Sequence, residues 1–193
     1  MKLESIWDIF LIEMEKDIDS SLTKIRGTKK LLSVSTASEH DFNRIMEIYR
    51  YAQDYMIRSG NPSQWGHAYP EAEMIKADIR TNRCKVIHDN KGIHGVFALF
   101  DGEDPTYNYI ENGEWLNDDP YITIHRIAGD GQVHGLLSCA VSYCRSICSN
   151  IRIDTHEDNK IMQRQIEKNG FRKCGTIYLE NGAPRLAYHL VIK

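Results

Sequence analysis

The sequence contains no apolar run that approaches the ~20 residues a helix needs to cross a bilayer. Its N-terminal stretch is also unlike a secretory signal peptide, because acidic residues interrupt it at Glu4, Asp8, Glu13 and Glu15. We therefore expect a cytoplasmic protein with no membrane partner.

Large basic blocks are equally absent. The chain has 24 Lys and Arg residues against 27 Asp and Glu, for a formal charge of −3, and its densest basic stretch is the short one over 24–30. Counterion release from a nucleic acid needs a broad basic surface, so we expect no nucleic-acid partner.

The cysteines form neither a complete disulfide framework nor a zinc motif. There are five of them, and an odd number favours a reducing compartment. Cys139, Cys144 and Cys148 are five and four residues apart, which fits one buried helix face better than a zinc knuckle. We expect no bound metal.

What is present is the pattern of one domain preceded by a helix. The 193 residues suffice for a sizeable core. Residues 3–18 carry apolar side chains at three- and four-residue spacing, which predicts an amphipathic helix. We expect it to pack onto the main domain or onto a second subunit, so a homodimer is one alternative. A linker near 26–30 divides the chain into 1–30 and 31–193.

Strand and helix patterns alternate through the larger part. One strand opens at Val34, and a helix capped by Ser38 or Asp41 runs through Met56. Further helices are predicted over 71–80, 133–148 and 159–169, and further strands over 84–88, 93–100, 121–128, 151–155, 173–179 and 185–192. This order predicts the α/β (α+β) class with a mixed central sheet.

Two segments carry the most information. In 151–171, an apolar alternation leads to a helix that Asp158 or Asn159 can cap and that Gly170 can end in a left-handed conformation. In Gly129–Leu136, glycines stand just before a helix, whose free N–H groups and dipole suit a phosphate. Many such turns bind nothing, so this loop alone leaves its role open.

Together these segments resemble the acetyl-CoA-binding core of the GCN5-related N-acetyltransferase (GNAT) family, and the resemblance covers most of 34–193. The family pattern Asn-x-x-Ala-x-x-Leu-Tyr-x-Lys-x-Gly-Phe is matched by Asn159, Lys168, Gly170 and Phe171, whereas its Ala, Leu and Tyr are replaced by Met162, Gln165 and Ile166. The resemblance implies a mostly antiparallel sheet flanked by helices, with a splayed central strand pair.

The resemblance also implies where acetyl-CoA binds as a co-substrate. Of the family's loop (Gln/Arg)-x-x-Gly-x-(Gly/Ala), which holds the pyrophosphate through backbone amides, Gln132 and Gly135 match and Leu137 does not. The implied cofactor-binding residues are Arg126, Ile127 and Ala128 along the pantetheine arm, Gln132, Val133, His134, Gly135, Leu136 and Leu137 in the loop, and Asn159.

The implied activity is transfer of an acetyl group from acetyl-CoA to a primary amine of a small molecule or a protein. His125, His156 and Asp154 are the candidate catalytic residues, because a strand's period of two places Asp154 and His156 on one face, beside the strand of His125. A structural role for these histidines stays open. Their order along the chain does not favour a metal-binding facial triad.

Aromatic residues on two loops are expected to wall the acceptor pocket, or else to pack as lids on the core: Trp65, Tyr69, Tyr107 and Trp115. Arg185 is a further candidate for this wall. Ile166 cannot protonate the leaving thiolate as the family's Tyr does, so Tyr143, Tyr178 or Tyr188 takes this role, or the thiolate leaves unaided.

Two other functions stay open. The replacement of Tyr by Ile166 keeps a non-catalytic CoA-binding sensor module on the same fold as the alternative function. An interaction protein that assembles through the N-terminal helix is the third hypothesis.

Overall fold

The structure is a computed structural model that describes residues 31–102 and 104–192. The amphipathic helix and linker predicted over 1–30 lie outside the described residues. The division of the chain near residue 30 therefore stays a prediction.

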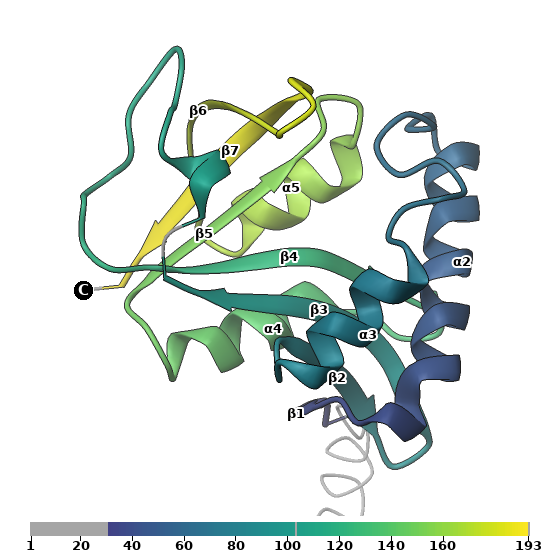
Figure 1. The fold of residues 1–193 in the computed structure, drawn as a ribbon. Coiled ribbons are helices and arrows are strands. Elements are labelled where there is room, and N and C mark those ends of the chain that lie inside the picture. Colours follow the sequence, from purple (N-terminus) through teal and green to yellow (C-terminus); the bar gives the residue numbers. More distant parts are fainter. Residues whose placement is uncertain (1–30, 103, 193) are drawn as a thin grey trace, which may run out of the picture. The chain divides into compact units, whose positions relative to one another are not determined.

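A seven-stranded sheet forms the centre of the described chain, in the order β1-β2-β3-β4-β5-β7-β6 (Figure 1). Every neighbouring pair is antiparallel except β4 and β5, which are parallel. The strands are β1 Ser33–Thr36, β2 Cys84–Asp89, β3 Gly92–Asp101, β4 Ile122–Gly129, β5 Asn150–Thr155, β6 Arg172–Tyr178 and β7 Pro184–Val191. The predicted class, with a mixed and mostly antiparallel sheet, is confirmed.

Two helices cover each face of this sheet. The helices are α2 Phe42–Arg58, α3 Ala72–Arg80, α4 Leu136–Arg145 and α5 Lys160–Lys168. Side chains of α4 and α5 share one core cluster with Phe97 of β3, whereas α2 and α3 pack with Val96, its neighbour on the same strand. Since successive residues of a strand point to opposite faces, the two helix pairs lie on opposite sides of the sheet.

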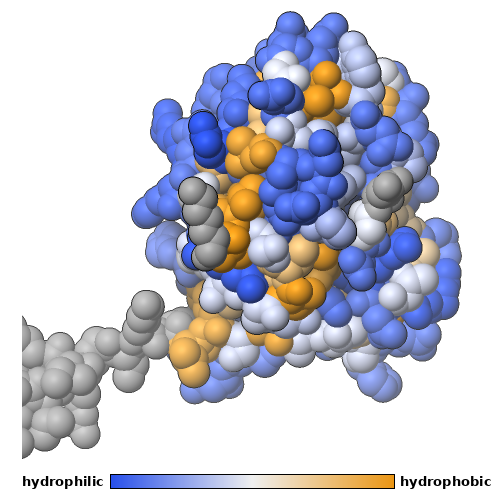
Figure 2. Space-filling model, turned by 90° about the vertical axis from the view of Figure 1, so that its left-hand side faces the viewer, coloured by the Kyte–Doolittle hydropathy of each residue, from blue (hydrophilic) through white to orange (hydrophobic). Residues whose placement is uncertain are grey.

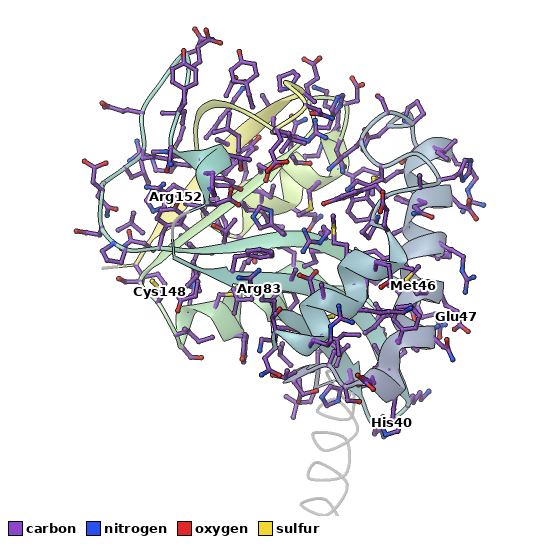
Figure 3. All side chains as sticks on the ribbon, in the orientation of Figure 1. His40, Met46, Glu47, Arg83, Cys148 and Arg152 are labelled. Carbon is purple, nitrogen blue, oxygen red and sulfur yellow. The ribbon has the colours of Figure 1, made fainter. Side chains whose placement is uncertain are left out.

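The segment between β3 and β4 covers part of the face on which α2 and α3 lie. Its Tyr107 packs with Ile177 and Ala187 of β6 and β7. Arg152 reaches this segment from β5 (Figure 3), with its guanidinium 4.0 Å from the Trp115 ring centre and an NH2 donor 3.2 Å from the carbonyl oxygen of Asn117. Cation–π contact and hydrogen bond together fix the segment over the end of the sheet.

The parallel pair β4–β5 is short. Only Ile122, Thr123 and Ile124 have partners on β5, which are Ile151, Arg152 and Ile153. Beyond these pairs the two strands separate (Figure 1), so the expected splayed pair is confirmed. A bulge in β4 accompanies the separation, because the β3–β4 register shifts opposite Phe97 and Arg126 takes a φ of 52°.

Local sequence signals explain how α5 begins and ends. The side chain of Asn159 accepts a hydrogen bond from the N–H of Met162 (3.0 Å) and caps the helix. At the other end Gly170 has a φ of 91°, and the N–H of Phe171 turns back to the carbonyl oxygen of Ile166. These bonds form a Schellman motif, as the Gly-Phe pair predicts.

The helix α4 is shorter than predicted at both ends. It spans Leu136–Arg145 rather than 133–148, because Gly135 takes a left-handed φ of 83° and residues from 146 onward leave the helix. The apolar stripe continues beyond both ends of the helix, which is why the sequence pattern predicts a longer one. The start of α4 is therefore displaced by one turn relative to the sequence pattern.

Hydrophilic residues predominate on the face shown in Figure 2, and the apolar ones gather in a few places between them. Among the described residues, none of the helices combines the length and apolar character that a membrane crossing requires.

Candidate active site

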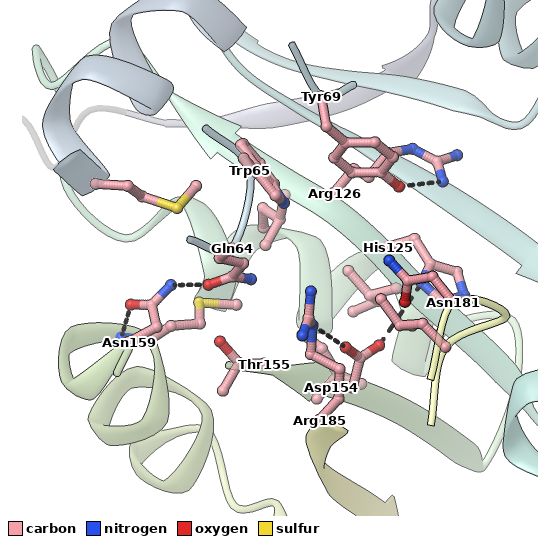
Figure 4. A pocket seen from close by; sticks show the side chains of 16 residues that line it. Gln64, Trp65, Tyr69, His125, Arg126, Asp154, Thr155, Asn159, Asn181 and Arg185 are labelled. Atoms are coloured by element: carbon pink, nitrogen blue, oxygen red, sulfur yellow. Dashed lines mark hydrogen bonds and ion pairs between the residues drawn. The ribbon is translucent and has the colours of Figure 1, made fainter. Parts of the chain in front are cut away.

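A cavity of about 300 Å³ opens where β4 and β5 separate (Figure 4). Its lining comes from β4, the end of β5, the α2–α3 loop, the start of α5 and the β6–β7 turn. It is therefore built by segments from across the described chain, and the divergence of two neighbouring strands creates the space.

His125 of β4 lines this cavity and is held by a carboxylate. Its Nε2 lies 2.8 Å from Oδ2 of Asp104, while Oδ1 of Asp104 accepts hydrogen bonds from the N–H and hydroxyl of Thr106. Burial acts to raise the pKa of Asp104, but the hydrogen bonds from His125 and Thr106 outweigh it and bring that pKa to about 2. An ionised Asp104 can only accept, so Nε2 carries the proton and Nδ1 presents a lone pair.

Asp154 of β5 lies on the other side of this histidine. Its Oδ1 is 3.8 Å from Nδ1 of His125, beyond hydrogen-bond distance, and accepts a hydrogen bond from the hydroxyl of Tyr107 (2.8 Å). Burial, followed by the charge of Asp154, raises the pKa of Tyr107 well above its usual value. Tyr107 therefore remains protonated and serves as the donor to Asp154.

The structure separates His156 from these two catalytic candidates. His156 is not among the residues that line the cavity, and its Nδ1 accepts a hydrogen bond from the backbone N–H of Asp158 (3.2 Å). Asp154 and His125 thus meet as the strand pairing predicts, whereas His156 participates in the turn after β5.

The four aromatic residues predicted for the acceptor wall fall into two groups. Trp65 and Tyr69 line the cavity, with their ring centres 6.2 Å apart. Tyr107 and Trp115 stack on each other at 5.4 Å in a core cluster and do not line it. Tyr107 still reaches the site, through its hydroxyl bond to Asp154.

The loop before α4 has room for a phosphate. A Cβ built on Gly135 would meet nothing within 4 Å, so this backbone is open to a ligand. The N–H of Gln132 is taken by Oδ1 of Asp130 (2.9 Å), which leaves the first turn of α4 to supply donors. Leu137 is buried in the core and does not crowd the loop. The exposed His134 and the partly exposed Val133 and Leu136 complete the predicted segment.

The remaining cofactor candidates lie along the cavity. Arg126 and Ile127 line it, Ala128 is buried beside α2 and α3, and Asn159 lines it at the start of α5. The Asn159 amide also donates to Oε1 of Gln64 (3.0 Å), a bond that joins α5 to the α2–α3 loop. Beyond Ile124, the edge of β4 that faces β5 is not paired with any strand in the described part of the chain.

Ile166 does not face the cavity. It is fully buried and packs in the core cluster beneath α5. The three alternative tyrosines do not line the cavity either: Tyr143 packs against Phe97, Tyr178 donates to Glu111, and Tyr188 is buried in the core. Tyr69 is the tyrosine that does line it.

The two most deeply buried cysteines are unsuited to nucleophilic chemistry. Burial raises the pKa of Cys84 and of Cys144 to about 12, so neither supplies a thiolate at neutral pH. Within 31–102 and 104–192, no cluster of three or more His, Cys, Asp or Glu side chains could hold a metal ion.

Sequence reasoning missed Asp104 and Gln64. Asp104 precedes Pro105 and caps a short 3₁₀ turn, a local signal that predicts its hydrogen bond to Thr106. No local signal predicts that its other oxygen reaches His125, 21 residues later in the chain. Gln64 stands next to Trp65 in the α2–α3 loop, and no local signal predicts its bond to Asn159, 95 residues later in the chain.

Solved acetyltransferases share this fold. A GNAT-family acetyltransferase from Streptococcus agalactiae 2603 is 28% identical, with a TM-score of 0.77 over 84% of this chain and 96% of that chain. Another from Listeria monocytogenes 4b F2365 is 17% identical, with a TM-score of 0.63 over 83% and 95%. The yncA protein from Salmonella typhimurium, solved with its cofactor acetyl-CoA, is 15% identical, with a TM-score of 0.56 over 84% and 94%.

No protein-family model matches the sequence, and a comparison with curated proteins gives no match. The fold itself is nevertheless clear from the solved structures. The chain has the GNAT fold, as the motifs around Gly135 and Asn159 imply.

Proposed function

We propose that this protein is an acetyl-CoA-dependent N-acetyltransferase that acetylates a primary amine. The single observation that carries the proposal is His125, held by Asp104 through one nitrogen and presenting the other to the cavity between β4 and β5. The similarity to solved acetyltransferases, one of them containing acetyl-CoA, supports the same general chemistry. A cytoplasmic location and a dimer formed through 1–30 stay predictions.

The residues present fit acetyl-CoA. The first turn of α4, next to the open Gly135, offers backbone N–H groups to a pyrophosphate, and the unpaired edge of β4 along Arg126 and Ile127 offers backbone groups to an extended amide-bearing arm. When bound, acetyl-CoA supplies the acetyl group as a thioester. The carbonyl oxygen of Arg126 already accepts from the hydroxyl of Tyr49 (3.1 Å), which fixes the bulge in β4.

His125 serves as the general base, directly or through one water. Asp104 fixes its tautomer, so Nδ1 accepts the proton that the amine loses on attack. The imidazolium that results lies between two carboxylates, because Asp154 is 3.8 Å from Nδ1. This arrangement stabilises the charged base in the transition state.

Departure of the thiol group receives no acid from α5, because Ile166 is an apolar core residue. A thiol with a pKa of about 8.5 is a tolerable leaving group without a protein acid. The lack of an acid at Ile166 also supports the second candidate function, a CoA-binding module that does not turn over. Turnover distinguishes the two.

The test is calorimetric titration with acetyl-CoA, followed by mass spectrometry of products after incubation with primary amines. We expect micromolar binding and N-acetylated products. Binding without any product would favour the non-catalytic module, and absence of binding would reject both.

A matched pair of variants tests the phosphate loop. Gly135→Asp places a negative charge where we expect the pyrophosphate, so its dissociation constant for acetyl-CoA should rise about 10- to 100-fold. Gly135→Asn has nearly the same shape and also tolerates a left-handed φ, and it should lose far less affinity. Equal losses in the two variants would point to strain rather than to phosphate binding.

A further inference from the structure

Arg185 of β7 is a nearly buried cation at the cavity, with 9% of its side chain exposed. Its NH1 donates to the carbonyl oxygen of Pro184 (2.9 Å), and its Nε lies 3.9 Å from Oδ2 of Asp154, beyond hydrogen-bond distance. The other arginine in the lining differs, because Arg126 donates to Asp78 at 2.6 Å. Among the described residues, Arg185 therefore has one loose ion pair with Asp154 and no carboxylate hydrogen-bonded to its fork.

This arrangement is costly unless a ligand completes it. Burial lowers the pKa of Arg185, and the charge of Asp154 only partly opposes this effect. A desolvated guanidinium is stabilised when it donates two parallel hydrogen bonds to one carboxylate, a geometry that the distant Asp154 does not supply. The residue is thus prepared for an anion that enters the cavity.

The position of Arg185 relative to the base narrows the class of acceptor. Asp154 lies between the two, with one oxygen 3.8 Å from Nδ1 of His125 and the other 3.9 Å from Nε of Arg185 (Figure 4). An ammonium group is attracted to Asp154 beside His125, and an anion is attracted to Arg185. The two groups of a small zwitterion match these charges.

We propose that the acceptor is an amino acid whose free carboxylate binds Arg185 while its amino group lies beside His125 and Asp154. The inference rests on the proposed function and narrows it from amines in general to amino carboxylic acids. In the transfer, an N–C bond forms and the C–S bond breaks. The bound ammonium first releases one proton to solvent water. On attack the neutral amine loses a second proton to His125, the electron pair leaves with sulfur as the thiolate, and the carboxylate at Arg185 is unchanged.

The first test compares acids with their amides on the unaltered protein. A pool of the standard L-amino acids and a pool of the corresponding amino acid amides are each incubated with acetyl-CoA, and N-acetyl products are measured by mass spectrometry. We expect the preferred acid to react at least 10-fold faster than its amide at low concentration. Equal or faster reaction of the amides would overturn the carboxylate site and leave the proposed function intact.

The second test uses variants of Arg185. Arg185→Gln should raise KM for the preferred acid about 10- to 100-fold, with little change in KM for acetyl-CoA, because a charged hydrogen bond is lost. It should also abolish the difference between acid and amide. Arg185→Lys restores the charge and should recover part of the affinity. An unchanged preference for the acid in Arg185→Gln would overturn the assignment.

The two proposals fail in distinguishable ways. Binding of acetyl-CoA with no product from either pool, or from simple alkylamines, would contradict the proposed function and with it the acceptor. If alkylamines react as fast as the best amino acid, the amino acid acceptor is contradicted and the proposed acetyltransferase function stands. A peptide acceptor would supply the carboxylate from its second residue instead. Leu-Asp amide is therefore assayed beside leucine, and faster reaction of Leu-Asp amide would contradict a free amino acid as the acceptor.

Discussion

Two histidines on neighbouring strands are each flanked by two carboxylates, yet they are built differently. On β3, both ring nitrogens of His94 lie 3.0 Å from carboxylate oxygens, those of Asp89 and Asp130. On β4, His125 has one close carboxylate, Asp104 at 2.8 Å, and one distant one, Asp154 at 3.8 Å. The exposed fraction is 6% for the side chain of His94 and 17% for that of His125.

The difference indicates a structural role for His94 and supports the catalytic role that we propose for His125. His94 has both nitrogens occupied, so it has no lone pair to offer to a substrate. Its partner Asp130 also accepts from Arg44 (2.5 Å) and from the N–H of Gln132, and so anchors the loop before α4. His125 keeps one nitrogen in reach of the cavity.

The largest expected effect comes from replacing His125, the histidine that keeps one nitrogen in reach of the cavity. His125→Gln can still donate to Asp104 but cannot accept a proton at neutral pH, so we expect kcat to fall about 10²- to 10⁴-fold. Affinity for acetyl-CoA, measured by titration, should change less than about threefold, because His125 lies away from the phosphate loop. His156→Gln is the matched control and should turn over normally. Equal losses in both variants would remove the distinction between these histidines.

Replacing His94, whose two ring nitrogens both have carboxylate partners, should lower the stability of the fold. His94→Ala takes the bridging group away from two buried carboxylates, and breaking a buried charged network costs about 3–5 kcal/mol of unfolding free energy. Urea denaturation measures this loss, and His125→Gln should lose less than about 1 kcal/mol in the same assay. A stable His94→Ala protein with reduced turnover would reverse the roles that the geometry assigns.

A third histidine, which has no carboxylate partner in the part of the chain that the structure describes, extends the comparison. His189 is fully buried, and burial, followed by the charge of Arg152, lowers its pKa to about 4. Because this folded pKa lies below the unfolded value near 6.5, the fold favours neutral His189, and stability is lost as the pH falls from 6.5 to 4. We expect a loss of about 3 kcal/mol over this range.

The non-titrating variant His189→Gln isolates this effect. Its unfolding free energy, measured by urea denaturation from pH 7 to 4, should decline less steeply than that of the unaltered protein. Parallel curves would show that other groups account for the acid sensitivity.

Much of the fold was predictable because its signals are local. The cap at Asn159 and the stop at Gly170 define α5 within the segment itself. The sequence pattern predicts too early a start for α4, because the left-handed Gly135 belongs to a loop that Asp130 anchors through Arg44, 86 residues away along the chain. An apolar stripe carries no information about such an anchor.

The candidate site divides in the same way. His125 and Asp154 were predictable together, because their adjacent strands follow from the pattern. The contact between His125 and Asp104 depends on how the 104–121 segment folds over the sheet, which no periodicity reveals. The sorting of Trp65 and Tyr69 into the cavity, and of Trp115 into a core cluster, likewise depends on tertiary packing.

The early end of the β4–β5 ladder has one more consequence. A strand edge with open backbone groups is a template on which other proteins add a strand and aggregate, so folded proteins cover or shorten such edges. Here the open edge of β4 after Ile124 lies within the sheet, opposite β5, rather than at its rim. The space beside it is about 300 Å³, so its backbone groups face a cavity rather than another strand. The fold thus keeps hydrogen-bonding backbone groups available inside the sheet, away from its rim strands β1 and β6.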